Sequence, residues 1–518
     1  MKKQVLIIFV IAIGIIACND SWNEHYAADQ TVSSNYENVM ELINDQADLS
    51  TFKQMIEFTG YDVFLRSNQS YTVWAPTNSA FSGPIDWTDS LSIAHTVTNH
   101  ITRSSYPTSR VAREESRILM LARKFITFVR TGTNGWTFGN EALVEKDLAA
   151  KNGIVHKINN IIPFEDNLWQ YLKQGETLDS ICKYLYSFDV YAFDEYNSVF
   201  LGTNESGQRL YDSVFYYRNP LVQSDLRAQL AVEDSIYTML IPNNDAWNKA
   251  YAKVKDLYRP YIRSTVTQAY RDSVQDSHTK RALVNDLIYR GSLENFSSHP
   301  ADSLTSTSNN VFYAPARLFE NASPKPLSNG IAYITDELKF GQIEAWQKPV
   351  VWEAENALGR TNTASSVYVR YATGSLISGI SRDCYLLVNN ISTLNPLVEF
   401  SIPNTLAGTY NIWCIFVPGN IENEREREKT KVQFRLTYLR ENGTSVTERN
   451  IRPDDRETSE TEMKAILVRE NFKFPYANYN EEETTVKVTV ETEVAANETA
   501  IYVRRMRIDC ILLEPVEE

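Results

Sequence analysis

The sequence predicts a multidomain protein in which two related α/β (α+β) domains precede an all-β jelly-roll sandwich. The chain has 518 residues, and at about 150 residues per domain this length is enough for roughly three domains. One set of motifs occurs twice between residues 35 and 343. From about Val350 onward, the sequence changes to short alternating strands separated by turn residues, which is typical of a sandwich.

The first seventeen residues have the features of an export signal. Lys2 and Lys3 precede the uncharged apolar run Val5–Ala17, which is too short to span a bilayer. The run leads into Cys18 and resembles a bacterial lipobox, with Ile15 where Leu is usual. The resemblance implies removal of residues 1–17 and acylation (including palmitate) of Cys18, and several acyl chains form a stable membrane anchor. A soluble secreted protein with a free cysteine is the alternative.

Residues 18–34 contain the acylated cysteine of this prediction and a polar tether. Asp20 and Glu24 resemble the acidic surface-export signals of Bacteroidota-type outer-membrane lipoproteins, which implies display on the cell surface. Loss of Lys2 and Lys3 leaves 49 basic against 65 acidic residues, a net charge of −16. We therefore expect no nucleic-acid partner, because such proteins need clustered cations to contact phosphates.

The repeated motifs predict two domains of similar fold, at residues 35–165 and 166–343. The sequence YTVWAPTNSAF at 71–81 corresponds to YTMLIPNNDAW at 237–247, and NGIVHKI at 152–158 corresponds to NGIAYI at 329–334. In each copy a short β-rich run ends at a proline, and an Asn-Gly turn precedes a second strand. Asn78 and Asp245 are expected to cap the helices that follow.

These motifs resemble the two conserved boxes of fasciclin domains, with Asn99-His100 as the element between them. The first copy matches well and includes His156. In the second copy, which is degenerate, we expect Asp286 and Tyr333 to replace the two histidines, with long polar insertions near 197–230 and 250–280. The resemblance implies compact α/β domains used in adhesion and extracellular binding.

The segment 350–518 resembles the galactose-binding-like jelly roll of family-six carbohydrate-binding modules. The resemblance is carried by residues 352–355 at its start, 408–413 in the middle and 507–513 at its end. It implies a structural calcium ion, for which Glu353, Glu355 and Asp509 would supply oxygen ligands if the first and last strands pair. Their alternative role is to lie exposed or to cap loops.

Aromatic platforms for a sugar ring are few in this domain. We expect Trp413 to lie in the core, because it falls in an apolar strand. Trp346 and Trp352 flank the start of the domain, where packing on the preceding domain is an equal alternative. Tyr368, Tyr371 and Tyr385 lie in a more polar stretch. The alternating charges of residues 420–431 predict a solvated loop.

The remaining cysteines and several serines leave alternatives open. Cys182, Cys384, Cys414 and Cys510 lack CxxC spacing, which argues against zinc; a bridge from Cys384 to Cys414 or Cys510 is undecided. Six serines lie between Asp and an aliphatic residue, as in the O-glycosylation sequon of Bacteroidota envelope proteins, although helix caps and turns would explain them too. These are Ser90, Ser180, Ser213, Ser235, Ser273 and Ser303.

We expect a non-catalytic protein, because the sequence contains no known catalytic signature. His100 and His156 fall on fasciclin motif positions, where a hydrogen-bonded structural role is favoured. The architecture resembles accessory lipoproteins of Sus-type, TonB-dependent uptake systems, which implies partners in a transporter, its lidding lipoprotein and a glycan. The alternative is an adhesin that binds glycan or matrix.

Overall fold

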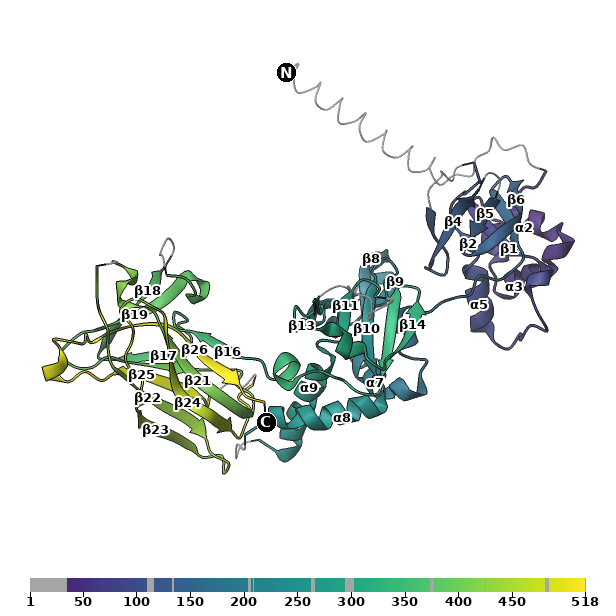
Figure 1. The fold of residues 1–518 in the computed structure, drawn as a ribbon. Coiled ribbons are helices and arrows are strands. Elements are labelled where there is room, and N and C mark those ends of the chain that lie inside the picture. Colours follow the sequence, from purple (N-terminus) through teal and green to yellow (C-terminus); the bar gives the residue numbers. More distant parts are fainter. Residues whose placement is uncertain are drawn as a thin grey trace, which may run out of the picture. The chain divides into compact units, whose positions relative to one another are not determined.

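The structure is a computed structural model, and Figure 1 labels its helices and strands. It describes residues 35–517 except 110–115, 133–134, 204–205, 208, 262–265, 294–301, 373–376, 424 and 480–483. The predicted signal, Cys18 and tether lie outside these residues. Within them, no helix has the length and apolar character needed to cross a membrane. The chain divides into two compact units, of which the first is 1–171 with 230–236 and 326–330, and the second is the remainder.

The first repeat packs helices against a mixed sheet. Its helices are α2 (Val39–Asn44), α3 (Ser50–Phe58), α4 (Asp62–Leu65) and α5 (Ser90–Thr98), with 3₁₀ turns η1 (Ala47–Leu49) and η2 (Asn78–Ala80). Its strands are β1 (Tyr71–Pro76), β2 (Ile101–Thr102), β3 (Ser116–Leu119), β4 (Phe125–Thr131), β5 (Gly135–Phe138), β6 (Glu141–Ala150) and β7 (Gly153–Ile158). The sheet order is β2-β1-β7-β6-β5-β4-β3, and β1 and β7 are parallel.

Strand β1 is buried on both faces, because helices cover one face of the sheet and its own far strands cover the other. Val73 joins the core formed with the helices. Trp74 points the other way and stacks on Phe138, with ring centroids 4.1 Å apart. Helix α3 has an apolar face, which buries Phe52 and Met55.

The second repeat has the same arrangement around its central strand. Its helical elements are α6 (Leu168–Tyr171), η3 (Glu176–Leu178), α7 (Asp179–Tyr186), η4 (Leu221–Asp225), α8 (Asn244–Lys255), η5 (Asp256–Tyr258), α9 (Gln268–Val284), η7 (Pro315–Phe319) and η8 (Gln342–Trp346). Its strands are β8 (Val190–Thr203), β9 (Arg209–Arg218), β10 (Tyr237–Pro242), β11 (Ile288–Arg290), β12 (Ser303–Thr305), β13 (Val311–Tyr313), β14 (Ser323–Leu327) and β15 (Gly330–Thr335). The order β11-β10-β15-β14 repeats β2-β1-β7-β6.

A buried asparagine performs the same task in each repeat. Asn152 accepts a hydrogen bond from the backbone N–H of Val39 at 2.7 Å. Its amide donates to the carbonyls of Leu65 at 2.9 Å and Ser67 at 2.7 Å. Asn152 therefore ties the start of α2, and the chain ahead of β1, to the turn between β6 and β7.

Asn329 makes the equivalent three bonds in the second repeat. It accepts from the N–H of Leu168 at 2.8 Å and donates to the carbonyls of Leu230 at 2.8 Å and Val232 at 3.2 Å. The predicted Asn-Gly turns are confirmed, and the side chains add a second function that the turn preference does not require.

The glycine after Asn152 is required by close packing. A Cβ at Gly153 would lie 2.2 Å from the carbonyl oxygen of Tyr71 and 2.8 Å from Val39 Cγ2. Any larger residue would push β7 away from β1 and from α2.

Asn78 has a different partner from the one expected. Instead of capping the turn that follows it, its side chain accepts from the N–H of Thr51 at 2.9 Å, at the start of α3. Asn244 bonds the N–H of Ser180 in α7 in the same way, at 2.9 Å. The cap of α8 is Asn243 rather than Asp245, because Asn243 accepts from Ala246 N–H at 2.8 Å.

The described parts of the two expected insertions of the second repeat contain regular secondary structure. The first forms the two-stranded hairpin β8–β9, in which the strands pair with each other. The second contains the end of α8 and most of α9. Both elements extend the repeat without changing the order of its central sheet.

A buried ion pair holds the first unit together beyond the first repeat. Lys124 Nζ lies 2.6 Å from Glu233 Oε1, with both side chains over 90% buried. The same nitrogen donates to Gln170 at 2.9 Å and Ser328 at 3.0 Å. The contacts explain why residues 230–236 and 326–330 belong to this unit, since separating them would leave a buried charge without a partner.

The C-terminal segment is the predicted β-sandwich. Its strands are β16 (Val350–Glu353), β17 (Arg360–Thr363), β18 (Ser365–Tyr371), β19 (Cys384–Asn390), β20 (Leu397–Ser401), β21 (Gly408–Phe416), β22 (Val432–Leu439), β23 (Ser445–Ile451), β24 (Lys464–Phe474), β25 (Lys487–Thr492) and β26 (Arg505–Pro515), with 3₁₀ turns η9 (Ser381–Asp383), η10 (Gly419–Ile421) and η11 (Ala496–Glu498). One sheet has the order β18-β19-β26-β21-β24, with β16 also paired to β26, and the other has the order β17-β20-β25-β22-β23. Apolar residues of both sheets form one core.

The orientation expected for Trp413 is wrong. In β21 the buried residues are Tyr410, Ile412, Cys414 and Phe416. Trp413 alternates with them, so its side chain lies on the outer face, half-buried, and its Nε1 donates to Glu514 at 3.0 Å. The period of two along the strand, rather than the apolar composition of the run, determines this orientation.

We predict that Asn152→Ala destabilises the first repeat by on the order of 3 kcal/mol, because three buried backbone groups lose their partner. Urea unfolding of the full chain measures the effect. Asn160→Ala is the control, since it removes an exposed bond to Glu141 and should change stability by less than about 0.5 kcal/mol. Equal midpoints for the two variants would contradict the role of Asn152.

Candidate functional site

His100 is a structural residue in the first repeat. Its side chain is completely buried. Nδ1 donates to the carbonyl of Thr96 at 2.7 Å, and Nε2 accepts from the N–H of Ile162 at 3.0 Å. These partners fix a neutral imidazole, and burial lowers its pKa to about 4.

His156 has an equally fixed tautomer. Nε2 donates to the carbonyl of Tyr106 at 3.0 Å, and Nδ1 accepts from the N–H of Asp147 at 3.2 Å. Burial lowers its pKa. In the second repeat Tyr333 replaces it, and the Tyr333 hydroxyl donates to the carbonyl of Leu293 at 2.6 Å. The substitution thus preserves a bond to the same point of the fold.

The expected replacement of His100 by Asp286 is wrong by one position. Trp74 N–H bonds the carbonyl of His100, and Leu240 N–H bonds that of Leu287, in equivalent strands. Leu287 is therefore the counterpart of His100, and Asp286 that of Asn99. Asp286 is buried and accepts from Ser306 at 2.7 Å and Asn310 at 3.1 Å.

The three predicted metal-binding carboxylates lie in one part of the sandwich. Strand β16 pairs with β26, so that Glu353 is opposite Cys510, next to Asp509. The turn η9 packs over them. Ser381 Oγ donates to Glu353 Oε1 at 2.6 Å, and Ser381 N–H donates to Asp509 Oδ1 at 3.0 Å.

Electrostatics within this cluster are unfavourable without a cation. Burial, together with the charges of Glu353 and Glu355, raises the pKa of Asp509 to about 7. Burial also raises the pKa of Glu355, with a contribution from Glu353. Two cations lie nearby. The Nε of Arg382 in η9 lies 3.4 Å from Glu353 Oε1, although its side chain is largely exposed, and the charge of Arg360 acts on Glu355.

The chemistry of these donors suits calcium better than their placement does. Oε2 of Glu353 and Oε2 of Glu355 are buried without a hydrogen-bond partner, and hard oxygen atoms are the ligands that calcium prefers. However, in the described part of the chain no three His, Cys, Asp or Glu side chains are arranged to hold one ion. Calcium binding by Glu353, Glu355 and Asp509 stays a prediction. Ser381 and Arg382, which complete the cluster, carried no sequence signal.

The aromatic residues considered for sugar stacking differ in exposure. Trp346 is buried next to Phe340, and Trp352 packs on the sandwich core. Tyr385 is buried, and its hydroxyl donates to Glu422 at 3.1 Å. Tyr368 and Tyr371 are exposed on the edge strand β18, but they are three residues apart and therefore point to opposite faces.

In the described part of the segment 420–431, Glu422, Asn423, Arg425 and Arg427 are exposed, as expected of a solvated loop, but a single cation ties the segment to the sandwich. Arg507 on β26 is 4% exposed, and its Nη2 lies 3.0 Å from Glu428, 3.7 Å from Glu426 and 3.8 Å from Glu422. Its charge therefore attracts the acidic residues of the segment onto the outer face of the sheet. Alternating charge alone could not reveal a partner some 80 residues later in the chain.

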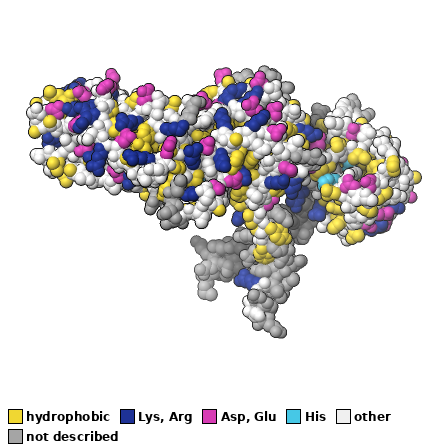
Figure 2. All heavy atoms as spheres, turned by 90° about the horizontal axis from the view of Figure 1, so that it is seen from below, with side chains coloured by type: hydrophobic (Ala, Val, Ile, Leu, Met, Phe, Trp, Pro, Cys, Tyr) yellow, Lys and Arg dark blue, Asp and Glu magenta, His cyan; other side chains and the backbone are white. Residues whose placement is uncertain are grey.

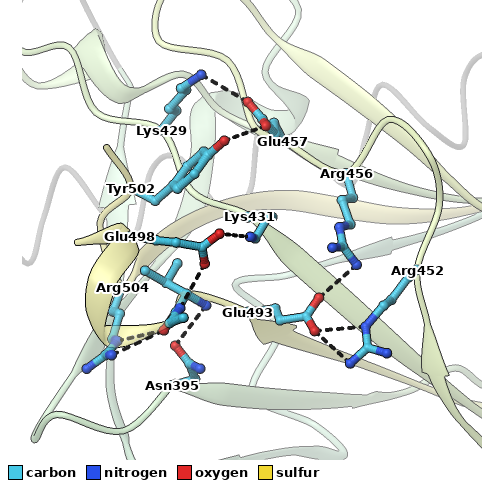
Figure 3. A network of polar contacts seen from close by, with 12 residues as sticks. Asn395, Lys429, Lys431, Arg452, Arg456, Glu457, Glu493, Glu498, Tyr502 and Arg504 are labelled. Carbon is cyan, nitrogen blue, oxygen red and sulfur yellow. Dashed lines mark hydrogen bonds and ion pairs between the residues drawn. The ribbon is translucent and has the colours of Figure 1, made fainter. Parts of the chain in front are cut away.

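A polar network closes one end of the sandwich (Figure 3). Tyr502 donates to Glu457 at 2.5 Å, and Lys429 pairs with the same carboxylate at 2.9 Å. Lys429 and Lys431 lie over the Tyr502 ring, each 5.3 Å from its centroid. These contacts cover Tyr502, so it is a poor platform for a sugar ring.

Further pairs join the neighbouring loops of this network. Glu493 accepts from Arg452 at 2.6 Å and Arg456 at 2.8 Å, and Glu498 pairs with Lys431. The Lys431 charge lowers the pKa of Glu498. The network orders the loops that join both sheets at this end.

The cysteines beyond Cys18 are all free thiols in the structure. Cys414 and Cys510 are buried, and burial raises the pKa of both. Cys182 and Cys384 are half-buried. The bridge left open for Cys384 is therefore not formed.

Comparison with known proteins identifies the first repeat. The family model described as the fasciclin domain matches residues 47–163. Residues 47–163 are a fasciclin domain. The second repeat shares its sheet order and its asparagine bonds, and so has the fasciclin fold. None of the curated proteins compared matches this chain.

Several solved structures are similar to parts of the chain. The fasciclin domain pair from the insect cell adhesion molecule fasciclin I has 14% identity, covers 57% of this chain and 98% of that one, and gives a TM-score of 0.21. A family 22 carbohydrate-binding module from Clostridium thermocellum Xyn10B has 14% identity, with 32% and 91% coverage and a TM-score of 0.21. A family 35 module from Clostridium thermocellum has 13% identity, with 33% and 99% coverage and a TM-score of 0.18.

We predict that acidification destabilises the first fasciclin domain through His100. Its pKa is about 4 when folded and 6.5 as a free side chain. The unfolded chain therefore binds the proton first, and unfolding free energy falls by up to about 3 kcal/mol between pH 6.5 and pH 4. Urea unfolding at pH 7 and pH 5 measures this slope. His100→Leu, which copies Leu287, should flatten it; an unchanged slope would contradict the assignment.

A second prediction concerns the effect of Asp509 on stability when a chelator keeps metal ions away from the protein. Between about pH 4 and pH 7, Asp509 is protonated in the folded protein but ionised in the unfolded chain, because its pKa is raised on folding. The contribution of this group to stability therefore falls as the pH rises through that range. Asp509→Asn keeps the acceptor for Ser381 and removes the charge. We expect it to melt above wild type at pH 8 in EDTA, by about 2–4 °C for each kcal/mol of relieved repulsion.

Calcium should reverse the order of the melting temperatures of wild type and Asp509→Asn. If the carboxylates bind calcium, millimolar CaCl₂ raises the melting temperature of wild type and leaves Asp509→Asn unchanged, because the variant lacks one ligand. Equal melting of both proteins in EDTA at pH 5 and pH 8 would contradict the electrostatic account. No shift with CaCl₂ would exclude the calcium site.

Proposed function

We propose that this protein is a non-catalytic, lipid-anchored surface protein that captures or docks a ligand, as an accessory component of a Sus-type TonB-dependent glycan uptake system. The observation that carries the proposal is the order of its parts. A segment that resembles a lipobox and ends at Cys18 precedes a fasciclin domain, a second repeat of the same fold and a β-sandwich. The anchor would hold binding modules at the outer membrane.

The state of the motif histidines supports a binding role over catalysis. His100 and His156 are buried, and both ring nitrogens of each are engaged in hydrogen bonds with the backbone. A general base needs a lone pair that reaches the substrate. These imidazoles hold loops and strands together instead.

An adhesin is the second candidate, because the fasciclin fold occurs twice in this chain. The two functions differ in their partners. An accessory component of a transporter forms a complex with an outer-membrane barrel, whereas an adhesin binds cells or matrix without one.

We predict that the tagged full-length protein co-purifies with a TonB-dependent barrel from detergent-solubilised outer membranes. Mass spectrometry of the eluate identifies the partner. Recovery of the protein alone would exclude a stable transporter complex and favour the adhesin, for which binding to glycan and matrix arrays is the next measurement.

Cys18→Ala is the matched control. Without the acceptor sulfur the protein should leave the outer-membrane fraction, and the intact mass should lack the acyl chains of wild type. If the variant stays in the membrane with an unchanged mass, the lipobox assignment fails independently of the transporter.

A further inference from the structure

We infer that the cleft between the second repeat and the β-sandwich binds an acidic saccharide, an inference that rests on the proposed role in ligand capture. All the residues that line the cleft belong to the second unit. The cleft has a volume of about 720 Å³, within the range of ligand sites in proteins. Lys253, Asp256 and Arg259 line one wall, and Arg440, Glu441 and Lys473 line the other.

Main-chain hydrogen bonds fix the two walls of this cleft. The N–H of Ala407 donates to the carbonyl of Leu257 at 2.9 Å, and the N–H of Ala477 donates to the carbonyl of Arg259 at 2.7 Å. Backbone bonds of this kind place η5 directly against the loops before β21 and after β24. The site is therefore preorganised rather than assembled by flexible side chains.

The floor of the cleft is equally constrained. Gly408 has φ of +135°, and a Cβ there would lie 2.5 Å from Gln347 Nε2. Gln347 is buried and accepts from Gln342 Nε2 at 2.7 Å. Gln342 itself lines the cleft, so a polar amide is held in place at the base.

The charge of the cleft opposes that of the chain. Four cations and two carboxylates line it, which gives a local charge of +2 on a protein whose net charge is −14. This local excess of positive charge favours an anionic ligand over a neutral one. The face in Figure 2 likewise shows Lys and Arg side chains spread among acidic and hydrophobic ones.

Two of the cations are available for a ligand. Lys253 lies over the Trp346 ring, 5.4 Å from its centroid, and Arg440 begins a tight turn in which its N–H and carbonyl bond Thr444 and Gly443. Neither forms an ion pair with a carboxylate of the described chain. Arg259, in contrast, is paired with Asp256 at 3.3 Å.

The spacing of these groups favours a saccharide with separate acidic groups. Lys253 belongs to the second repeat and Arg440 to the sandwich, so the two cations reach the cleft from different domains. Gln342 and Asn442 offer amides for hydroxyl groups, and Tyr438 and Phe474 offer apolar surface. Carboxylates or sulfates on neighbouring sugar rings would meet Lys253 and Arg440 together.

Affinity electrophoresis of the mature-length protein tests the inference. The gels contain polygalacturonate, alginate or chondroitin sulfate, and methyl-esterified polygalacturonate serves as the uncharged match for the first. We expect retardation by at least one acidic polymer, little by the ester, and weakening by salt. Lys253→Gln with Arg440→Gln should reduce the affinity at least tenfold, while unfolding as wild type does.

Lys249→Gln with Arg449→Gln is the control, because both residues are exposed and lie outside the cleft lining. It should bind as wild type. Equal binding by the cleft variant, or no retardation by any acidic polymer, would overturn the inference. Binding of a neutral glycan by both the cleft variant and the control variant would also overturn the inference, but it would leave the proposed ligand capture intact. The barrel pull-down tests the transporter role separately.

Discussion

The fold of both repeats depends on one buried asparagine side chain in each. The side chains of Asn152 and Asn329 each form hydrogen bonds with three main-chain groups. Each lies where the start of a helix, the segment before the central strand and an Asn-Gly turn meet. An amide has one acceptor and two donors in a plane, and both residues use all three. The helical layer therefore cannot shift relative to the sheet without leaving buried backbone groups unpaired.

This constraint explains which differences between the repeats are tolerated. Tyr333 preserves the bond that His156 makes, although its ring is a different size. Leu287 takes the place of His100 and is completely buried, so an apolar contact replaces two hydrogen bonds. Insertions such as β8–β9 leave the order of the central strands unchanged.

Much of this fold could be predicted from the sequence, because the determining patterns are local. The proline after each central strand, the Asn-Gly turns and the alternation in residues 410–416 are all visible within a few positions. Trp413 shows how a local pattern can be misread: the apolar run predicts a buried strand, but only its period assigns the faces. The partners of Arg507 and Asn78 could not be predicted, since those contacts link residues 27 to 85 positions apart.

The residues of the candidate sites could likewise be predicted only in part from the sequence. A family resemblance predicted the carboxylates Glu353, Glu355 and Asp509. Only the folded structure places Ser381 and Arg382 next to them. The cleft had no sequence signal at all, because Lys253 and Arg440 lie 187 positions apart and belong to different folds. Each is an ordinary exposed cation by itself.

The position of the cleft also constrains how such a protein can bind a ligand. Its walls come from two domains, and the bonds from Ala407 and Ala477 to η5 and Arg259 hold them together. A sandwich alone would keep Arg440 and Lys473 but lose the opposing cations, and the second repeat alone would keep only Lys253 and Arg259. A ligand with two acidic groups can therefore meet both Lys253 and Arg440 only when both domains are present. Recognition at this site is therefore a property of the domain pair, and the fasciclin fold contributes to it through the end of α8 and η5 rather than through its conserved motifs.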